Sequence, residues 1–234
     1  MFGPILAALG QSGRGEEAMR QSMFSYINPT FATGITTKTA PTAYDATHGF
    51  CYMYNGDASR WALLDRLFLR MTQANTGATS WHICFTKDAG NLYSSGGTDV
   101  IAAAAGAGIV NVGATTVKAT GPTLPTTVIR PSIISKMYVG DITLSAATAA
   151  SRLLYRRQVR SVIFAANDSL DITFGEGTSG SHGTTTAGAE KSLSFPQVWI
   201  APGEGLLMSE LAPGPQSQNP APEMQISWLE RPAP

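Results

Sequence analysis

The segment RWALLDRLFLRMTQ, residues 60–73, is the strongest apolar stretch of the chain, and its conformation decides the fold class. A helical interpretation is possible, because apolar residues recur at spacings of three and four. These residues are Trp61, Leu64, Phe68 and Met71. Intrinsic propensity also favours a helix, since Leu, Arg and Met are good helix formers.

A strand interpretation fits the same residues at a period of two, with only Asp65 out of place. The residues that then share one face are Trp61, Leu63, Leu67, Leu69 and Met71. The flanking sequences decide between the two interpretations. GFCYMYNGD before the segment and WHICFTKDAG after it are short strand-like runs bounded by turn residues. We therefore predict a strand over residues 60–73, with Trp61, Leu63, Leu67 and Leu69 facing a core.

The rest of the chain repeats this organisation. SVIFAA, LDITFG, FPQVWI, GLLMSEL and EMQISWLERP are strand-like runs separated by loops of very unequal length. No repeat period indicates a propeller or a solenoid. Long helices do not alternate with strands, as they would in a doubly wound α/β fold. The sequence predicts an all-β protein, a jelly-roll-type β-sandwich of roughly eight or nine strands.

Two segments depart from the strand pattern. Residues 1–47 are rich in Gly, Thr and Pro and are interpreted as an extended N-terminal arm, followed by the sandwich domain at 48–234. The arm lies either on a partner or on its own domain. Residues 94–127 form a Gly/Ala-rich insertion, predicted to be a long loop with one or two strands or a short Ala helix. The apolar residues of the arm are Phe2, Ile5, Leu6, Phe24, Tyr26, Ile27 and Phe31.

Charge limits the kinds of partner. Only 14% of the 234 residues are charged, against roughly 25% in an average soluble domain. Lys plus Arg and Asp plus Glu are both 16, so the net charge is zero and neither nucleic acid nor an anionic membrane is indicated. The N-terminus lacks the basic region of a signal peptide, so we expect synthesis in a cytoplasm without export. Cys51 and Cys84 are predicted to be buried thiols, with a cross-strand disulfide as the alternative.

Motifs that carry chemistry are not found. His48, His82 and His182 lie at no spacing typical of metal ligands. No nucleophile elbow or phosphate-binding loop is present. Asp168 and Asp171 are predicted to be solvated carboxylates. The sequence therefore predicts no catalytic residue, no metal and no cofactor.

Arg152, Arg156 and Arg160 are spaced so that they would project from one face of a strand. Such a row could hold an acidic partner surface through bidentate pairs with carboxylates. It could equally be a solvated face or a contact between subunits.

Several of these runs, taken in order, suggest a family. RWALLDRLFLRMTQANTGATSWHICFTKD, SRLLYRRQVRSVIFAANDSLDITFGEG, FPQVWIAPGEGLLMSEL and QISWLER resemble tailed-bacteriophage capsid decoration (cement) and related minor capsid proteins, over most of residues 48–232. The resemblance implies a jelly-roll subunit, commonly a homotrimer, on the outer capsid surface of the virion. Its partners would be the major capsid protein and other copies of itself, and the arm would anchor it. The insertion at 94–127 has no counterpart in this resemblance.

A second class of function is a phage tail or head appendage that binds host carbohydrate. Tryptophans are the candidates for stacking on sugar, although their strand-like surroundings are more typical of core residues. These are Trp61, Trp81, Trp199 and Trp228. A hydrolase on a β-sandwich is a third class, with the least support.

Overall fold

The computed structural model describes residues 22–28, 33–37, 40–74, 80–101, 109–111, 132–145, 151–160, 164–175, 190–212 and 221–232. Their secondary structure consists of strands. In chain order these are β1 Met23–Ile27, β2 His48–Asn55, β3 Arg60–Met71, β4 Trp81–Asp88, β5 Tyr93–Asp99, β6 Val110–Asn111, β7 Ile134–Leu144, β8 Arg152–Arg160, β9 Ser169–Phe174, β10 Glu190–Phe195, β11 Trp199–Ile200, β12 Gly205–Leu211 and β13 Pro222–Pro232.

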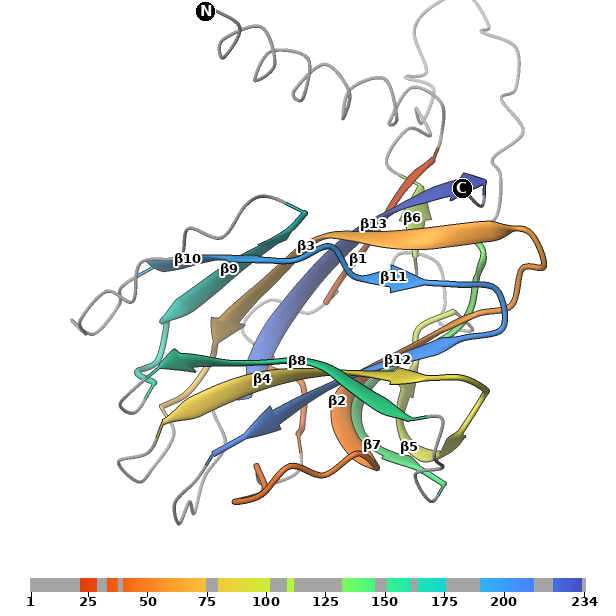
Figure 1. Cartoon of the computed structure of the whole chain (residues 1–234). Helices are drawn as coiled ribbons and strands as arrows, with labels where there is room; N and C mark the ends of the chain where they lie inside the picture. Colours follow the sequence, from red (N-terminus) through yellow and green to blue (C-terminus); the bar gives the residue numbers. More distant parts are fainter. Residues whose placement is uncertain are drawn as a thin grey trace, which may run out of the picture.

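The strands form two sheets that lie face to face (Figure 1). The first sheet has the order β10-β9-β3-β13-β1-β6, with β11 also paired to β3, and the second has the order β5-β7-β2-β12-β4-β8. The central part of the sandwich is a jelly roll. Four antiparallel strands of the first sheet, β9-β3-β13-β1, face four antiparallel strands of the second, β2-β12-β4-β8, and the chain crosses repeatedly between the two sheets. The predicted all-β, jelly-roll-type sandwich is confirmed.

One large core fills the space between the sheets. It combines aliphatic side chains with a group of aromatic ones: Phe85 packs against Phe174 and Phe195, each with ring centroids 5.4 Å apart. Each such side chain contributes roughly 1.5–3 kcal/mol on full burial. Cys51 and Cys84 are free and buried, as predicted, and burial raises the pKa of both thiols.

The opening segment is strand β3, which confirms its predicted conformation. One feature of its register differs from the expectation, however. Leu64 lies opposite Trp228 and Arg66 lies opposite Ser227, so Asp65 is an extra residue on β3. Such a bulge reverses the inward and outward faces. Leu67 and Leu69 face the core as predicted, whereas Trp61 and Leu63 belong to no core cluster and their neighbours Ala62 and Leu64 take the core positions.

The proposed boundary at residue 47 is corrected by β1. This strand lies in the first sheet between β13 and β6, with Phe24 opposite Trp228. Phe24 and Tyr26 are both 2% exposed, and the Phe24 ring stacks on that of Trp228 with centroids 6.1 Å apart. Pairing with β13 covers what would otherwise be an unprotected sheet edge. Residues 22–28 are therefore part of the sandwich, and Phe24 and Tyr26 are core residues.

The other apolar residues of the expected arm divide into two groups. Ile27 closes β1 and is 53% exposed, so it remains available for a contact. Ile35 and Ala40, between β1 and β2, are buried in the main core. Three further stretches of the arm, which include Phe2, Ile5, Leu6 and Phe31, lie outside the described residues.

The described part of the insertion extends both sheets. β5 pairs with β7 beyond β2, and β6 pairs with β1, so strands are present as one alternative predicted. The Ala-rich residues 102–108 lie outside the described residues. After the insertion, Glu230 holds the start of β7 to β13, because its Oε1 accepts hydrogen bonds from Ser132 Oγ at 2.6 Å and from the backbone N–H of Ile133 at 2.8 Å.

Candidate functional site

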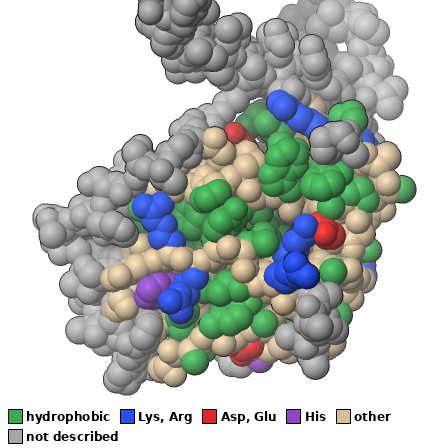
Figure 2. Space-filling view, in the orientation of Figure 1, with side chains coloured by type: hydrophobic (Ala, Val, Ile, Leu, Met, Phe, Trp, Pro, Cys, Tyr) green, Lys and Arg blue, Asp and Glu red, His purple; other side chains and the backbone are tan. Residues whose placement is uncertain are grey.

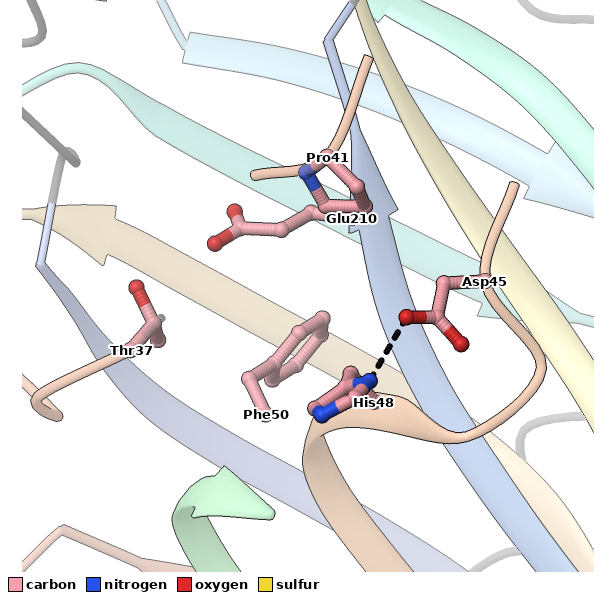
Figure 3. Close-up of a pocket in the computed structure, with 7 residues that line it drawn as sticks. Thr37, Pro41, Asp45, His48, Phe50 and Glu210 are labelled. Atoms are coloured by element: carbon pink, nitrogen blue, oxygen red, sulfur yellow. Dashed lines mark hydrogen bonds and ion pairs between the residues drawn. The ribbon is translucent and has the colours of Figure 1, made fainter. Parts of the chain in front are cut away.

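A small pocket lies where the chain segments before β2 cross the end of β12. Figure 3 shows that its side chains come from these segments, from β2 and from β12. Its volume is about 40 Å³, enough for only a few water molecules. The pocket is lined by Thr37, Pro41, Asp45, His48, Gly49, Phe50 and Glu210.

On one side of the pocket, Asp45 collects hydrogen bonds from its neighbours. Its Oδ2 lies 2.6 Å from Nδ1 of His48. Its Oδ1 accepts from the hydroxyl of Thr47 at 2.6 Å and from the Thr47 backbone N–H at 2.8 Å. Partial burial acts to raise the pKa of Asp45, but these hydrogen bonds outweigh it and the pKa is lowered. The carboxylate therefore fixes the turn that leads into β2.

Glu210 occupies the other side of the pocket, on β12. Glu210 as a whole is partly exposed, but its Oε1 atom is shielded from solvent and has no hydrogen-bond partner among the described residues. Burial raises the pKa of Glu210 to about 8, although a hydrogen bond from Thr37 acts in the opposite direction. Leu206 and Met208 precede it at a period of two and face the core. This spacing is a signal in the sequence that Glu210 points inward, although Glu210 is not among the residues predicted to form a site.

Beside the pocket, Asp45, Thr47 and His48 are hydrogen-bonded to one another. The Thr47 hydroxyl donates to Asp45 Oδ1 and lies 3.0 Å from Nδ1 of His48, but Thr47 is not among the residues that line the cavity. The His48 nitrogen that faces Asp45 is already engaged, and the cavity is too small for a substrate. No group of three His, Cys, Asp or Glu side chains within the described ranges could hold a metal ion. His182 lies outside those ranges.

Asp168 corrects another expectation. Instead of being solvated, it is fully buried, and its Oδ2 accepts a hydrogen bond from the backbone N–H of Ala165 at 2.8 Å. Asp171 forms a two-point ion pair with Arg66, with N–O distances of 2.6 and 2.7 Å. Both carboxylates therefore stabilise the start of β9 and its contact with β3.

A second, larger hollow opens along the edge of the sandwich. It is a groove of about 480 Å³ where β8 of one sheet approaches β11 of the other. Figure 2 shows hydrophobic side chains in several patches on this side of the molecule, with Lys and Arg side chains between them. The groove is lined by Trp61, Lys87, Leu154, Tyr155, Gln197, Val198 and Trp199.

The four tryptophans separate into two pairs. Trp81 and Trp228 are core residues, as their strand-like surroundings indicated. Trp61 and Trp199 lie instead in the edge groove, and their rings meet at 89° with centroids 5.6 Å apart. Trp199 is 38% exposed. The expectation of a core position is wrong for this pair, and the bulge at Asp65 is the reason for Trp61.

The arginines of β8 do not form the expected row. Arg152 lies opposite Lys87 and Arg156 lies opposite Cys84, with a register shift between them. Because Lys87 and Cys84 are three residues apart on β4, Arg152 and Arg156 point to opposite faces of the sheet. Arg160 lies opposite Trp81, and its side chain is outside the described part of the structure.

Arg156 shares its face with an exposed apolar residue. Leu153, which is 40% exposed, lies opposite Thr86, two residues from Cys84 on β4. Arg156 is exposed and forms no ion pair with the described residues, whereas Arg66 and Arg70 pair with Asp171 and Glu223. Its charge reaches His82, whose pKa is lowered first by burial and then by Arg156.

Comparisons of the chain with protein-family models, with curated proteins and with solved structures gave no match. The described residues contain no helix that is long and apolar enough to span a membrane. The function is therefore inferred from the fold and from the two faces of the β8 edge.

Proposed function

We propose that the chain is a structural virion protein, which binds the outside of a tailed-phage capsid shell as a decoration (cement) protein. It is made in the host cytoplasm, acts as a homotrimer on the outer capsid surface, and catalyses no reaction. Its partners are the major capsid protein and other copies of the chain, and it binds neither nucleic acid nor membrane. The jelly roll supports this proposal, because the fold is common among virus structural proteins, although it also serves lectins and cupins.

The observation that carries the proposal is the surface formed by Arg156 and Leu153 on β8. An exposed guanidinium that has no carboxylate partner among the described residues, beside an exposed leucine on a sheet edge, is suited to a protein contact. Arginine is also enriched where protein surfaces meet. The partner surface would carry a carboxylate opposite Arg156 and an apolar patch opposite Leu153.

A homotrimer fits this surface if each copy also contacts its neighbour. In threefold symmetry a contact between two different patches closes on itself, so no open filament forms. The charge-poor surface lowers the cost of removing charges from water in such contacts. Light scattering should give three times the 24.6 kDa mass of the chain, and a monomer at micromolar concentration would contradict this part of the proposal.

Co-sedimentation with capsid shells tests the shell-binding part. Arg156→Glu should strongly reduce co-sedimentation, because it places a negative charge against an acidic partner surface. Lys136→Glu is the matched control, since it makes the same change in net charge on β7, away from β8. If both variants bind as the unmodified protein does, or if both lose binding equally, the β8 surface is not the contact.

A further inference from the structure

We propose that the edge groove between β8 and β11 binds carbohydrate, with the exposed faces of Trp199 and Trp61 as the stacking surfaces. This binding is separate from the shell contact, because the groove and the Arg156 surface use different faces of β8. It would give the chain a function beyond that of a structural protein. The argument rests on the aromatic walls, the polar rim and the size of the groove.

The aromatic walls are arranged to hold a ring-shaped ligand. The two indoles stand at 89°, so they form a corner with two apolar walls instead of a flat patch. A pyranose has an apolar face of C–H groups that packs on an indole, and hydroxyl groups around its edge. Tryptophan suits such a mixed ligand, since it combines a large apolar surface with one polar N–H group. Trp199 leaves 38% of its surface exposed for this contact.

The rest of the groove fixes the position of these walls. The Nε2 of Gln197 donates hydrogen bonds to the backbone oxygen of Leu64 at 2.7 Å and to that of Val198 at 3.3 Å. The backbone N–H of Leu64 donates to the oxygen of Val198 at 3.0 Å. Val198 itself is buried in the main core. These bonds attach the segment that carries Trp199 to β3, so the corner is formed before a ligand binds.

The polar rim can meet the hydroxyl groups of a sugar. Lys87 lines the groove, and its Nζ lies 2.6 Å from Oε2 of Glu204, which is not itself a lining residue; both side chains are partly exposed. The same Oε2 accepts the backbone N–H of Ala201 at 2.9 Å. The ammonium group has three N–H donors and the carboxylate has a second oxygen, so the pair retains both donors and an acceptor. Charge-assisted hydrogen bonds from such groups to hydroxyls are stronger than neutral ones.

The dimensions favour a small carbohydrate over other occupants. The groove volume of about 480 Å³ falls within the range of roughly 300–1,000 Å³ for small-ligand sites. A purely apolar ligand would offer no acceptor to the remaining N–H donors of the Lys87 ammonium group. A second copy of the chain needs a broad surface of about 800 Å² on each side, whereas these residues line a hollow.

The test uses the full chain without capsids and a panel of glucose, galactose and N-acetylglucosamine with their short oligomers. Saturation-transfer NMR and tryptophan fluorescence should show saturable binding of at least one sugar at millimolar concentrations. Trp199→Ala should weaken that binding by about tenfold, and Trp199→Phe should retain part of it, because an aromatic face remains. Lys87→Met should also weaken binding, since it keeps the stem of the side chain and removes its donors.

Leu153→Ala is the control, because Leu153 is exposed on the opposite face of β8, and it should bind sugar as the unmodified protein does. Circular dichroism of each variant establishes that it is folded. The proposal is overturned if no sugar of the panel binds saturably, or if folded Trp199→Ala and Lys87→Met both bind unchanged. It is also overturned if the fluorescence change depends on protein concentration alone, since Trp199 would then be covered by a second copy.

Discussion

Ser227 donates a hydrogen bond from its Oγ to Oδ2 of Asp65 at 3.1 Å, where β3 holds one residue more than β13. The bulge allows Leu64 and Leu67, three residues apart, to face the same core. It also directs Trp61 away from that core and into the edge groove. One irregularity of pairing thus creates both a continuous core and an exposed aromatic site.

The bulge predicts unequal effects of two leucine substitutions on β3. Leu67→Ala should lower the free energy of unfolding by about 2–5 kcal/mol, because Leu67 is fully buried in the main core. Leu63→Ala should cost less, since Leu63, although only 9% exposed, belongs to neither core cluster. Chemical denaturation of both variants measures the difference. Equal losses would mean that β3 pairs without the bulge.

The position of β1 predicts that the fold depends on residues within the N-terminal segment 1–47. Phe24→Ala should lower the free energy of unfolding by about 3–5 kcal/mol, because it removes a buried ring that stacks on Trp228. Ile27→Ala, at the exposed end of the same strand, is the control and should cost little. Deleting residues 1–35 removes β1 and should abolish cooperative unfolding. A deletion variant as stable as the full chain would show that β1 is dispensable.

Glu210 predicts a pH dependence of stability. Its pKa is about 8 in the folded chain, above the ordinary value of 4.5, so the folded state binds the proton more tightly than the unfolded state does. Its contribution is fully present below pH 4.5 and is lost as pH rises toward 8, at up to about 1.4 kcal/mol per pH unit. Glu210→Gln imitates the protonated form and should flatten this slope.

The measurement is the free energy of unfolding from denaturant titrations between pH 5 and pH 9. Glu210→Gln should be more stable than the unmodified protein at pH 8–9 and similar to it at pH 5. Glu223→Gln, which removes a carboxylate that pairs with Arg70 at the surface, should leave the slope in place. A slope that persists in Glu210→Gln would assign the effect to another group.

Local patterns predicted the fold class, because alternating apolar residues mark strands whichever partners they take. They could not predict where β1 lies, since Phe24 pairs with Trp228 at the other end of the chain and nothing local indicates that contact. The prediction that the β8 arginines share one face was wrong for a related reason. The register shift on β8 arises from pairing with β4, and it separates Arg152 from Arg156.

The candidate sites were only partly visible in the sequence. Asp65, out of place in the alternation, marked the bulge that exposes Trp61, and the spacing of Glu210 from Met208 marked an inward carboxylate. The groove itself could not be predicted, because it joins β3, β4, β8 and the segment before β11. Its existence depends on how closely the two sheets approach at one edge.

The most direct test of the proposed function is a cryo-electron microscopy reconstruction of virions that carry this chain. We predict jelly-roll density in groups of three on the outer surface of the capsid shell, with the Arg156 face of β8 against the major capsid protein. Particles made with Arg156→Glu should lack this density. Jelly-roll density confined to the tail, or an outer shell without it, would contradict the proposal.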